Sequence, residues 1–318
     1  MERKIRELRY LVIGAGGTGG CIAGYLAKGG RDVAVIARGA HLEAIRRNGL
    51  KIIRPDRVLT ISVQAEEEKE YKEKADVIFV CVKGYSLDST YELIKKAAHE
   101  DTVVIPLLNI YGTGERMSER LPGIRVLNGC IYIAGSIERP GVLRQSGEIF
   151  RIIYGSVDGG TENPVCRQAE VDLRACGIEA VYSDDVRRDT FKKYSFVSAM
   201  AAVGAFYGSN AGDAKREGAV RSMFVSCVKE IEALAEAMGI DFGEDMAEAN
   251  LKILHGLADD CTASMQKDLE KGGQTEMDGL VFEVVRLGNK YHVPVPDYLR
   301  IAEKFKFHLE DGRAVQTK

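Results

Sequence analysis

The sequence predicts an α/β domain with a mostly parallel sheet over residues 1–185, followed by an all-α domain over residues 186–318. Three observations support this prediction. Short apolar runs alternate with helix-like stretches through the first half of the chain, as in sheets whose strands are buried on both faces. The first apolar run leads into a glycine-rich turn. Beyond Asp189 the strand-like runs cease and a helical spacing of apolar residues takes over.

The composition is that of an ordinary globular protein. The chain has 318 residues, of which 45% are hydrophobic and 29% charged, and its net charge is −3. This balance gives no electrostatic basis for binding nucleic acid or a membrane surface. No apolar run approaches the roughly 20 residues that span a bilayer, and the N-terminus lacks the apolar segment of a secretory signal. We therefore expect a cytoplasmic protein without nucleic-acid or membrane partners.

The seven cysteines and five histidines indicate neither a disulfide framework nor a metal site. The cysteines are scattered and form no C-x-x-C pair, which is typical of reduced thiols in a cytoplasm. The histidines lie far apart and show no metal-ligand spacing. We expect no metal.

The first apolar run, Leu8–Ile13, leads directly into a G-x-G-x-x-G motif, and a helix-like stretch, Cys21–Lys28, follows. In this Rossmann-type arrangement the first glycine permits the tight turn, the second admits a pyrophosphate, and the third packs the helix against the strand. The phosphates lie at the helix N-terminus. We expect a dinucleotide there rather than an empty turn, and the cofactor-binding residues are Gly14, Ala15, Gly16, Gly17, Thr18 and Gly19.

The end of the second predicted strand, Asp32–Ile36, indicates which cofactor is bound. Sites that prefer NAD usually carry an acidic residue there, which accepts hydrogen bonds from the ribose. Here the strand continues into Ala37 and Arg38. A guanidinium pairs with a 2′-phosphate instead. The sequence thus favours NADP(H), the alternative being that Arg38 is a solvated loop charge.

Between this strand and the next, the pattern predicts a short helix over His41–Asn48 and a hairpin of Leu50–Ile53 with Val58–Val63. The mixed charge run Glu66–Lys74 is expected to be a solvated helix face.

Two more buried strands, Val77–Val82 and Val103–Leu108, end at Lys83 and Asn109. Ser86 is expected to cap the intervening helix. In an open parallel sheet, ligands bind beyond the carboxyl ends of the strands. Both side chains are therefore cofactor candidates, together with the glycine motif and the arginine.

The last part of the first domain has a different pattern. Short strand-like pieces over Arg125–Tyr154, separated by turn signals at Pro140–Gly141 and Ser146–Gly147, predict a small antiparallel extension of the same sheet. A helix over Asn163–Cys176 and a last strand over Glu179–Tyr182 precede the expected boundary, Ser183–Arg188.

The second domain is predicted to be built from helices. The first is rich in small residues, which indicates a central helix with close neighbours. The tail after Asp311 is expected to be loose. The predicted helices are Asp189–Tyr207, Val220–Met238, Asp245–Ser264, Met277–Tyr291 and Tyr298–Leu309.

Over essentially its whole length the chain resembles the ketopantoate reductase (2-dehydropantoate 2-reductase) family. The resemblance implies an α/β domain followed by an all-α domain, NADPH as cofactor, reduction of a 2-oxo acid, and a site in the cleft between the domains. Besides the glycine motif, the segments that carry it are ARGAHLEAIRRNGL (37–50), VKGY (82–85), LLNIYG (107–112), FKKYSF (191–196), ASMQKD (263–268), TEMD (275–278) and VPVP (293–296).

The resemblance also implies roles for individual residues. The family places a lysine two residues after an aromatic residue, which here is Lys193 after Phe191. A lysine ammonium can stabilise the developing oxyanion and donate its proton. Lys193 rather than Lys192 is therefore the candidate acid, unless both are surface lysines. Glu276 matches a carboxylate that contacts the lysine or the substrate. Two further matches are Ser264, which binds the substrate in the family, and Asn109, which lies near nicotinamide and substrate.

Several positions depart from the family. Polar or glycine residues are replaced at five of them: Ile110, Val197, Ala201, Cys261 and Val281. These changes remove polar recognition of the substrate and leave the cofactor side intact. Because a buried hydroxyl without a partner is costly, the class of 2-oxo acids is a firmer expectation than ketopantoate itself.

The expected function is NADPH-dependent reduction of a small 2-oxo acid, with ketopantoate to pantoate, a step of pantothenate biosynthesis, as the first choice. One alternative is a related dehydrogenase of the 6-phosphogluconate, glycerol-3-phosphate or opine type. Another is a non-catalytic NADP(H)-binding redox sensor. The small residues of the first helix of the second domain also allow a homodimer.

Overall fold

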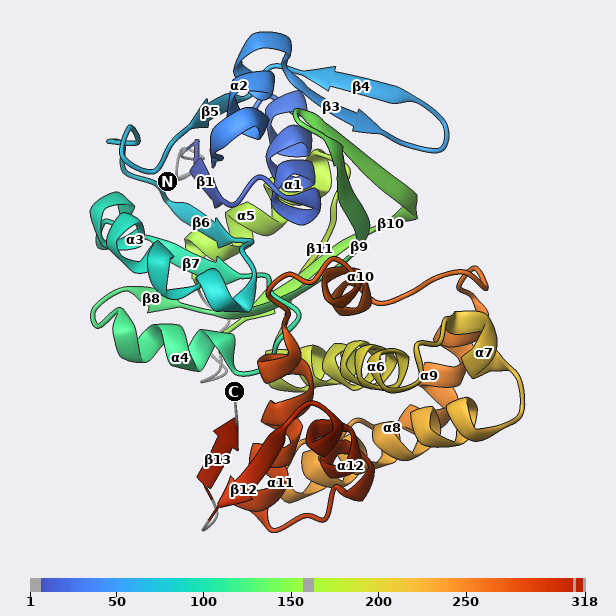
Figure 1. Ribbon diagram of the computed structural model, residues 1–318. Coiled ribbons are helices and arrows are strands. Elements are labelled where there is room, and N and C mark those ends of the chain that lie inside the picture. The colour runs from blue at the N-terminus through green and yellow to red at the C-terminus, as the bar shows by residue number, and fades with distance from the viewer. Residues whose placement is uncertain (1–6, 157–162, 311–312, 317–318) are drawn as a thin grey trace. The chain divides into compact units, whose positions relative to one another are not determined.

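The computed structural model describes residues 7–156, 163–310 and 313–316 (Figure 1). The chain divides into two compact units. The first comprises Met1–Leu108 and Gly112–Val186, and the second comprises Asn109–Tyr111 and Arg187–Lys318. The short segment Asn109–Tyr111 follows a strand of the first unit but packs with the second.

A six-stranded sheet forms the centre of the first unit, and every neighbouring pair in it is parallel. Its inner strands are buried along almost their whole length, which explains their unbroken apolar sequences. The predicted parallel sheet is confirmed. In spatial order the strands are β5 (Gln64–Glu66), β2 (Asp32–Ile36), β1 (Arg9–Ile13), β6 (Val77–Val80), β7 (Val103–Pro106) and β8 (Arg125–Val126).

The expected antiparallel extension of this sheet is wrong: Arg125–Val126 adds a parallel strand to it, and the residues from Asn128 onward form a second sheet. β9 (Asn128–Arg139) and β10 (Val142–Gly155) pair in antiparallel fashion. The turn expected at Ser146–Gly147 is an irregularity within β10, where Gly147 has a φ of +78°. A bulge of this kind bends a strand without ending it. β10 also pairs in parallel with two strands of other regions, and the remaining strands of the sheet are β3 (Leu50–Ile53), β4 (Val58–Ile61) and β11 (Glu179–Tyr182).

Helix α1 (Gly17–Lys28) contacts both sheets. Three of its four glycines, Gly17, Gly20 and Gly24, lie on the face turned to the second sheet, whereas Gly19 packs against the first. A Cβ on Gly17 would lie 2.2 Å from the carbonyl oxygen of Gly135 in β9. A Cβ on Gly24 would lie 2.7 Å from Ile52 of β3. These glycines therefore let the helix backbone approach the strands closely. The other helices of the unit are α2 (Gly39–Asn48), α3 (Tyr91–Ala97), α4 (Thr113–Arg120) and α5 (Pro164–Ala175).

Two local predictions in the first unit are wrong. The charge run Glu66–Lys74 forms no helix, because Tyr71 is buried within it and Glu70 accepts hydrogen bonds from Arg46 and from the backbone N–H of Glu67. Ser86 does not cap α3, since two 3₁₀ turns separate β6 from the start of that helix.

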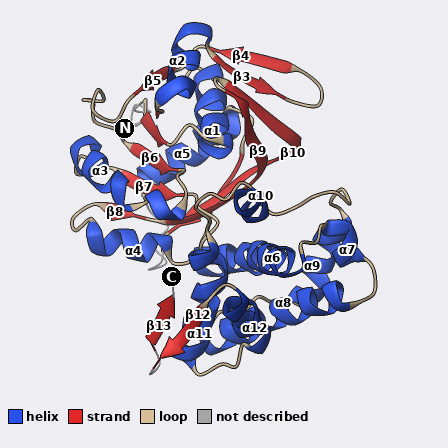
Figure 2. Cartoon of the chain, in the orientation of Figure 1, coloured by secondary structure: helices blue, strands red, loops and turns tan. Residues whose placement is uncertain are grey.

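The second unit consists mainly of helices, drawn in blue in Figure 2. The first, α6, is in contact with its neighbours at small residues, as predicted: a Cβ on Gly204 would lie 2.3 Å from the side chain of Gln266. The helices are α6 (Val186–Tyr207), α7 (Ala211–Lys215), α8 (Ala219–Ala237), α9 (Met246–His255), α10 (Ser264–Glu270), α11 (Glu283–Tyr291) and α12 (Pro296–Lys304).

The ends of several predicted helices shift. The helix expected over Asp245–Ser264 stops at His255, and α11 is preceded by a π turn, Asp278–Phe282. The last helix ends at Lys304, and the hairpin of β12 (Phe307–Glu310) with β13 (Arg313–Gln316) takes the place of its predicted end and of much of the expected loose tail. Residues 311–312 and 317–318 of that tail lie outside the described residues. Across the described ranges, no helix is both long and apolar enough to cross a membrane.

Candidate active site

The glycine motif forms the turn between β1 and α1, and the three glycines have the geometry that their predicted roles require. Gly14 has a φ of +102°, and a Cβ there would lie 2.9 Å from the carbonyl oxygen of Cys81. A Cβ on Gly19 would lie 2.1 Å from the carbonyl oxygen of Gly14. Side chains at either position would therefore disrupt the turn.

The space beside Gly16 is open, because a Cβ there would meet no atom within 4 Å. Gly16 is the N-cap of α1, no side chain of the described residues caps this end, and the first turn contains no acidic residue. The unpaired N–H groups of a helix N-terminus attract anions. This open, uncapped end thus fits the pyrophosphate of a dinucleotide, which the backbone of Gly16, Gly17 and Thr18 would hold.

Arg38 and Lys83 lie at the same carboxyl edge as the glycine turn, since β2 and β6 flank β1 in parallel. Arg38 is the N-cap of α2 and is exposed. Within the described part of the chain, no side-chain hydrogen bond or ion pair engages its guanidinium. Lys83 is half-buried and is the N-cap of the 3₁₀ turn after β6. An exposed guanidinium at this edge has the chemistry needed for a phosphate.

In the second unit, the structure distinguishes the two adjacent lysines. The Nζ of Lys193 donates a hydrogen bond to the Oδ1 of Asn109 at 2.7 Å, and Lys193 is only 8% exposed. The Nζ of Lys192 instead bonds the carboxylate of Glu244 at the surface, at 2.6 Å. Asn109 and Lys193, predicted from distant segments, are therefore in direct contact.

Packing around the segment Asn109–Tyr111 holds this asparagine in place. The ring of Tyr111 lies 4.5 Å from that of Phe191 and 5.9 Å from that of Tyr194, centroid to centroid. Ile110 fills the space beside Gly279, where a Cβ would lie 2.3 Å from its side chain. Ile110 replaces the glycine expected from the family, and here it anchors the segment on the π turn.

The π turn that follows Glu276 is fixed to α6 by two buried hydrogen bonds. The hydroxyl of Tyr194 donates to the carbonyl oxygen of Gly279 at 2.8 Å, and that of Ser198 donates to the carbonyl oxygen of Leu280 at 2.6 Å. Glu276 itself is buried. The helix that carries Lys193 thus also holds the segment that carries Glu276. Sequence reasoning assigned no role to Tyr194 or Ser198, because nothing in the pattern around Lys193 distinguishes them from other buried positions of the helix.

A second layer supports Ser198 from α12. Tyr298 is fully buried, and its hydroxyl lies 2.6 Å from that of Ser198. Both oxygens of Glu230 in α8 accept hydrogen bonds from the N-terminal N–H groups of α12, those of Asp297 at 2.8 Å and Tyr298 at 3.1 Å. Burial raises the pKa of the Glu230 carboxyl to about 7, against the opposing effect of these two hydrogen bonds.

This raised pKa predicts a pH dependence of stability. Between about pH 4.5 and pH 7 the folded protein holds a proton on Glu230 that the unfolded chain has released. The stabilisation is therefore complete below about pH 4.5 and is lost as the pH rises through 7, with a slope of at most about 1.4 kcal/mol per pH unit. We expect Glu230→Gln to abolish this part of the slope in urea unfolding measured from pH 5 to pH 8.

Glu232→Gln is the matched control, because Glu232 lies on the same helix and accepts a hydrogen bond from the backbone N–H of Met246. It should retain the slope. Equal slopes in the wild type and in Glu230→Gln would contradict the assignment.

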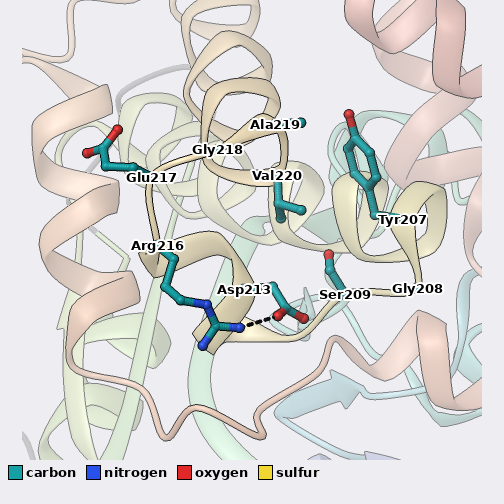
Figure 3. A pocket seen from close by; sticks show the side chains of 9 residues that line it. All are labelled: Tyr207, Gly208, Ser209, Asp213, Arg216, Glu217, Gly218, Ala219 and Val220. Atoms are coloured by element: carbon teal, nitrogen blue, oxygen red, sulfur yellow. Dashed lines mark hydrogen bonds and ion pairs between the residues drawn. The ribbon is translucent and has the colours of Figure 1, made fainter.

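Ser264 is a predicted site residue that forms no hydrogen bond with the cluster around Lys193 in the described part of the chain. Ser264 is exposed at the first position of α10 and makes no side-chain hydrogen bond among the described residues. Within the described ranges, no group of three or more His, Cys, Asp or Glu side chains could hold a metal ion. A surface cavity of about 300 Å³ near Ser209 and Val220 contains none of the predicted site residues (Figure 3).

Comparison with known proteins identifies the family. The ketopantoate reductase PanE/ApbA family model matches residues 10–159, and the model of its C-terminal domain matches residues 185–308. A 2-dehydropantoate 2-reductase from Mesorhizobium japonicum is 28% identical over 314 residues, which cover 91% of this chain and 94% of that protein. The uncharacterized oxidoreductase YkpB of Bacillus subtilis is 26% identical over 276 residues, which cover 86% of this chain and 89% of that protein.

A solved structure shows the same fold. The ternary structure of D-mandelate dehydrogenase with NADH and anilino(oxo)acetate superposes with a TM-score of 0.84 at 20% identity, covering 92% of this chain and 96% of that one. The two matched domains account for most of the sequence. The chain therefore belongs to the ketopantoate reductase PanE/ApbA family, and it is an oxidoreductase of the 2-hydroxy-acid dehydrogenase type that acts on CH–OH groups with a nicotinamide cofactor.

Proposed function

We propose that the protein uses NADPH to reduce a 2-oxo acid to the corresponding 2-hydroxy acid, with 2-dehydropantoate as the first substrate. The observation that carries this proposal is the hydrogen bond from the buried Lys193 ammonium to Asn109. The Mesorhizobium relative bears the name of this activity. D-Mandelate dehydrogenase, which shares the fold, extends the choice to bulkier 2-oxo acids.

Bound NADPH would supply the hydride to the carbonyl carbon of the substrate. The ammonium of Lys193 stabilises the negative charge that develops on the carbonyl oxygen and donates a proton to it, which completes the hydroxyl group. Asn109 accepts one N–H of this ammonium and so orients the remaining two. Glu276 provides a buried carboxylate for the lysine or the substrate.

The preference for NADPH over NADH is proposed from the end of β2. Ala37 and Arg38 occupy the positions where an NAD site would carry a carboxylate. The exposed guanidinium of Arg38 is then the partner of the 2′-phosphate.

The experiment is a steady-state assay of NADPH oxidation, followed by absorbance, with 2-dehydropantoate and a panel of 2-oxo acids with larger and more apolar side chains. The proposal predicts turnover with 2-dehydropantoate and a higher kcat/KM with NADPH than with NADH. Turnover only with a bulkier 2-oxo acid would reassign the substrate. NADPH binding without oxidation of NADPH by any 2-oxo acid would overturn the enzymatic role.

A further inference from the structure

His41 connects three parts of the first unit. It lies in the first turn of α2, three residues after Arg38. Its Nε2 is 2.9 Å from the carbonyl oxygen of Ala15, within the glycine turn. Its Nδ1 is 3.0 Å from the backbone nitrogen of Gly141, in the turn between β9 and β10. One half-buried ring thus bridges the glycine turn, the arginine-bearing helix and the second sheet.

The two contacts define the tautomer of this ring. A backbone N–H is always a donor, so Nδ1 accepts the hydrogen bond from Gly141 and carries no hydrogen. The hydrogen is therefore on Nε2, which donates to Ala15. Burial lowers the pKa of His41, which also favours this neutral ring. The histidine is a donor toward the glycine turn and an acceptor toward the hairpin.

The hydrogen bond from His41 to Ala15 couples the glycine turn to α2. Ala15 lies between Gly14 and Gly16, and its carbonyl is bonded by a side chain from the helix that begins at Arg38. A shift of α2 would therefore move the glycine turn and the arginine relative to each other. Both would bind phosphates of the same dinucleotide, so their spacing sets how well they bind it together.

We infer that His41 is a positioning residue of the cofactor site, which holds the glycine turn at the spacing from Arg38 that an adenosine 2′,5′-bisphosphate moiety requires. The inference rests on the proposed function, because it assumes that the bound nucleotide is NADPH. His41 itself touches no part of the ligand in this scheme.

The test separates the two hydrogen bonds of the ring. In His41→Gln the side-chain amide nitrogen replaces Nε2 and retains the donor to Ala15. In His41→Asn the side-chain oxygen replaces Nδ1, retains the acceptor for Gly141 and loses the donor. Dissociation constants are measured by titration with NADPH and with adenosine 2′,5′-bisphosphate, and the midpoint of thermal unfolding is recorded for each variant.

We expect His41→Asn to bind both ligands about tenfold more weakly, the effect of one lost hydrogen bond, and His41→Gln to bind them within about threefold of the wild type. His99→Asn is the matched control. His99 is also a half-buried histidine of the first unit whose ring makes two hydrogen bonds, with Asp76 and with the N–H of Asp101. It lies, however, near the amino ends of β6 and β7. The His99→Asn variant should have a lower midpoint of thermal unfolding and unchanged dissociation constants for both ligands.

Wild-type affinity in His41→Asn, with only a lower unfolding midpoint, would overturn the inference and leave the proposed function intact. Equal weakening in both His41 variants would overturn the role of the Ala15 contact. If the wild type bound neither NADPH nor NADH, the proposed function would fall, and the inference with it.

Discussion

Replacing Lys193 with alanine is expected to lower kcat with a 2-oxo acid by roughly 10²–10⁴-fold, the usual contribution of a positioned proton donor. The dissociation constant of NADPH should not change, because Lys193 belongs to the helical unit and the phosphate-binding groups belong to the other. Steady-state kinetics together with a fluorescence titration of NADPH measure the two quantities separately.

Lys192→Ala is the control for this experiment. The two lysines are neighbours, but Lys192 pairs with Glu244 at the surface, a contact worth about 1 kcal/mol or less. Its removal should leave kcat within about twofold of the wild type. A parallel loss of turnover and NADPH affinity in Lys193→Ala, or equal losses in the two variants, would remove the proton-donor role.

Replacing Arg38 with alanine is expected to raise the dissociation constant of NADPH by about 10- to 100-fold and to leave that of NADH nearly unchanged. A hydrogen bond to a charged group contributes roughly 1.5–3 kcal/mol, which corresponds to this range. NADH carries a neutral hydroxyl in place of the 2′-phosphate and so offers the guanidinium no charged partner. Titration of each variant with both nucleotides gives the ratio directly.

Arg47→Ala serves as the comparison, since Arg47 is an exposed arginine in the last turn of the same helix. It should weaken neither nucleotide by more than about twofold. If Arg38→Ala weakened NADPH and NADH equally, the preference for the phosphorylated nucleotide would need another source.

The local features of the fold could be predicted because nearby residues determine them. β1, β2 and the glycine turn follow from short apolar runs and from a motif whose glycines have fixed steric roles. The second sheet could not be predicted in the same way. β10 pairs with β3 on one part of its length and with β11 on another, and these partners are far apart in sequence. An alternation of apolar residues indicates that a strand exists, but it does not determine which other strand it pairs with.

The candidate site shows the same limit. The resemblance indicates Asn109 and Lys193 one by one, each in its own segment. The hydrogen bond between them depends on how Tyr111 packs against Phe191 and Tyr194. No spacing in the sequence encodes that packing. The contacts of Tyr194 and Ser198 with main-chain carbonyls were missed for a related reason, since a buried hydroxyl finds its partner only in the folded chain.

The π turn has a consequence for insertions and deletions. Successive residues of a regular α-helix are rotated by about 100° around its axis, and a π turn accommodates one residue more than regular winding would. If the same residues of Asp278–Phe282 wound as a regular α-helix, Glu276 would be rotated by about that angle relative to α11. The π turn absorbs the additional residue and so keeps Glu276 in phase with α11. Deleting one residue from the segment is therefore compatible with regular winding at nearly the same orientation of the carboxylate, whereas inserting a further residue would rotate it. The number of residues in this segment, together with its winding, sets the direction of Glu276 more than the identity of any one side chain in it.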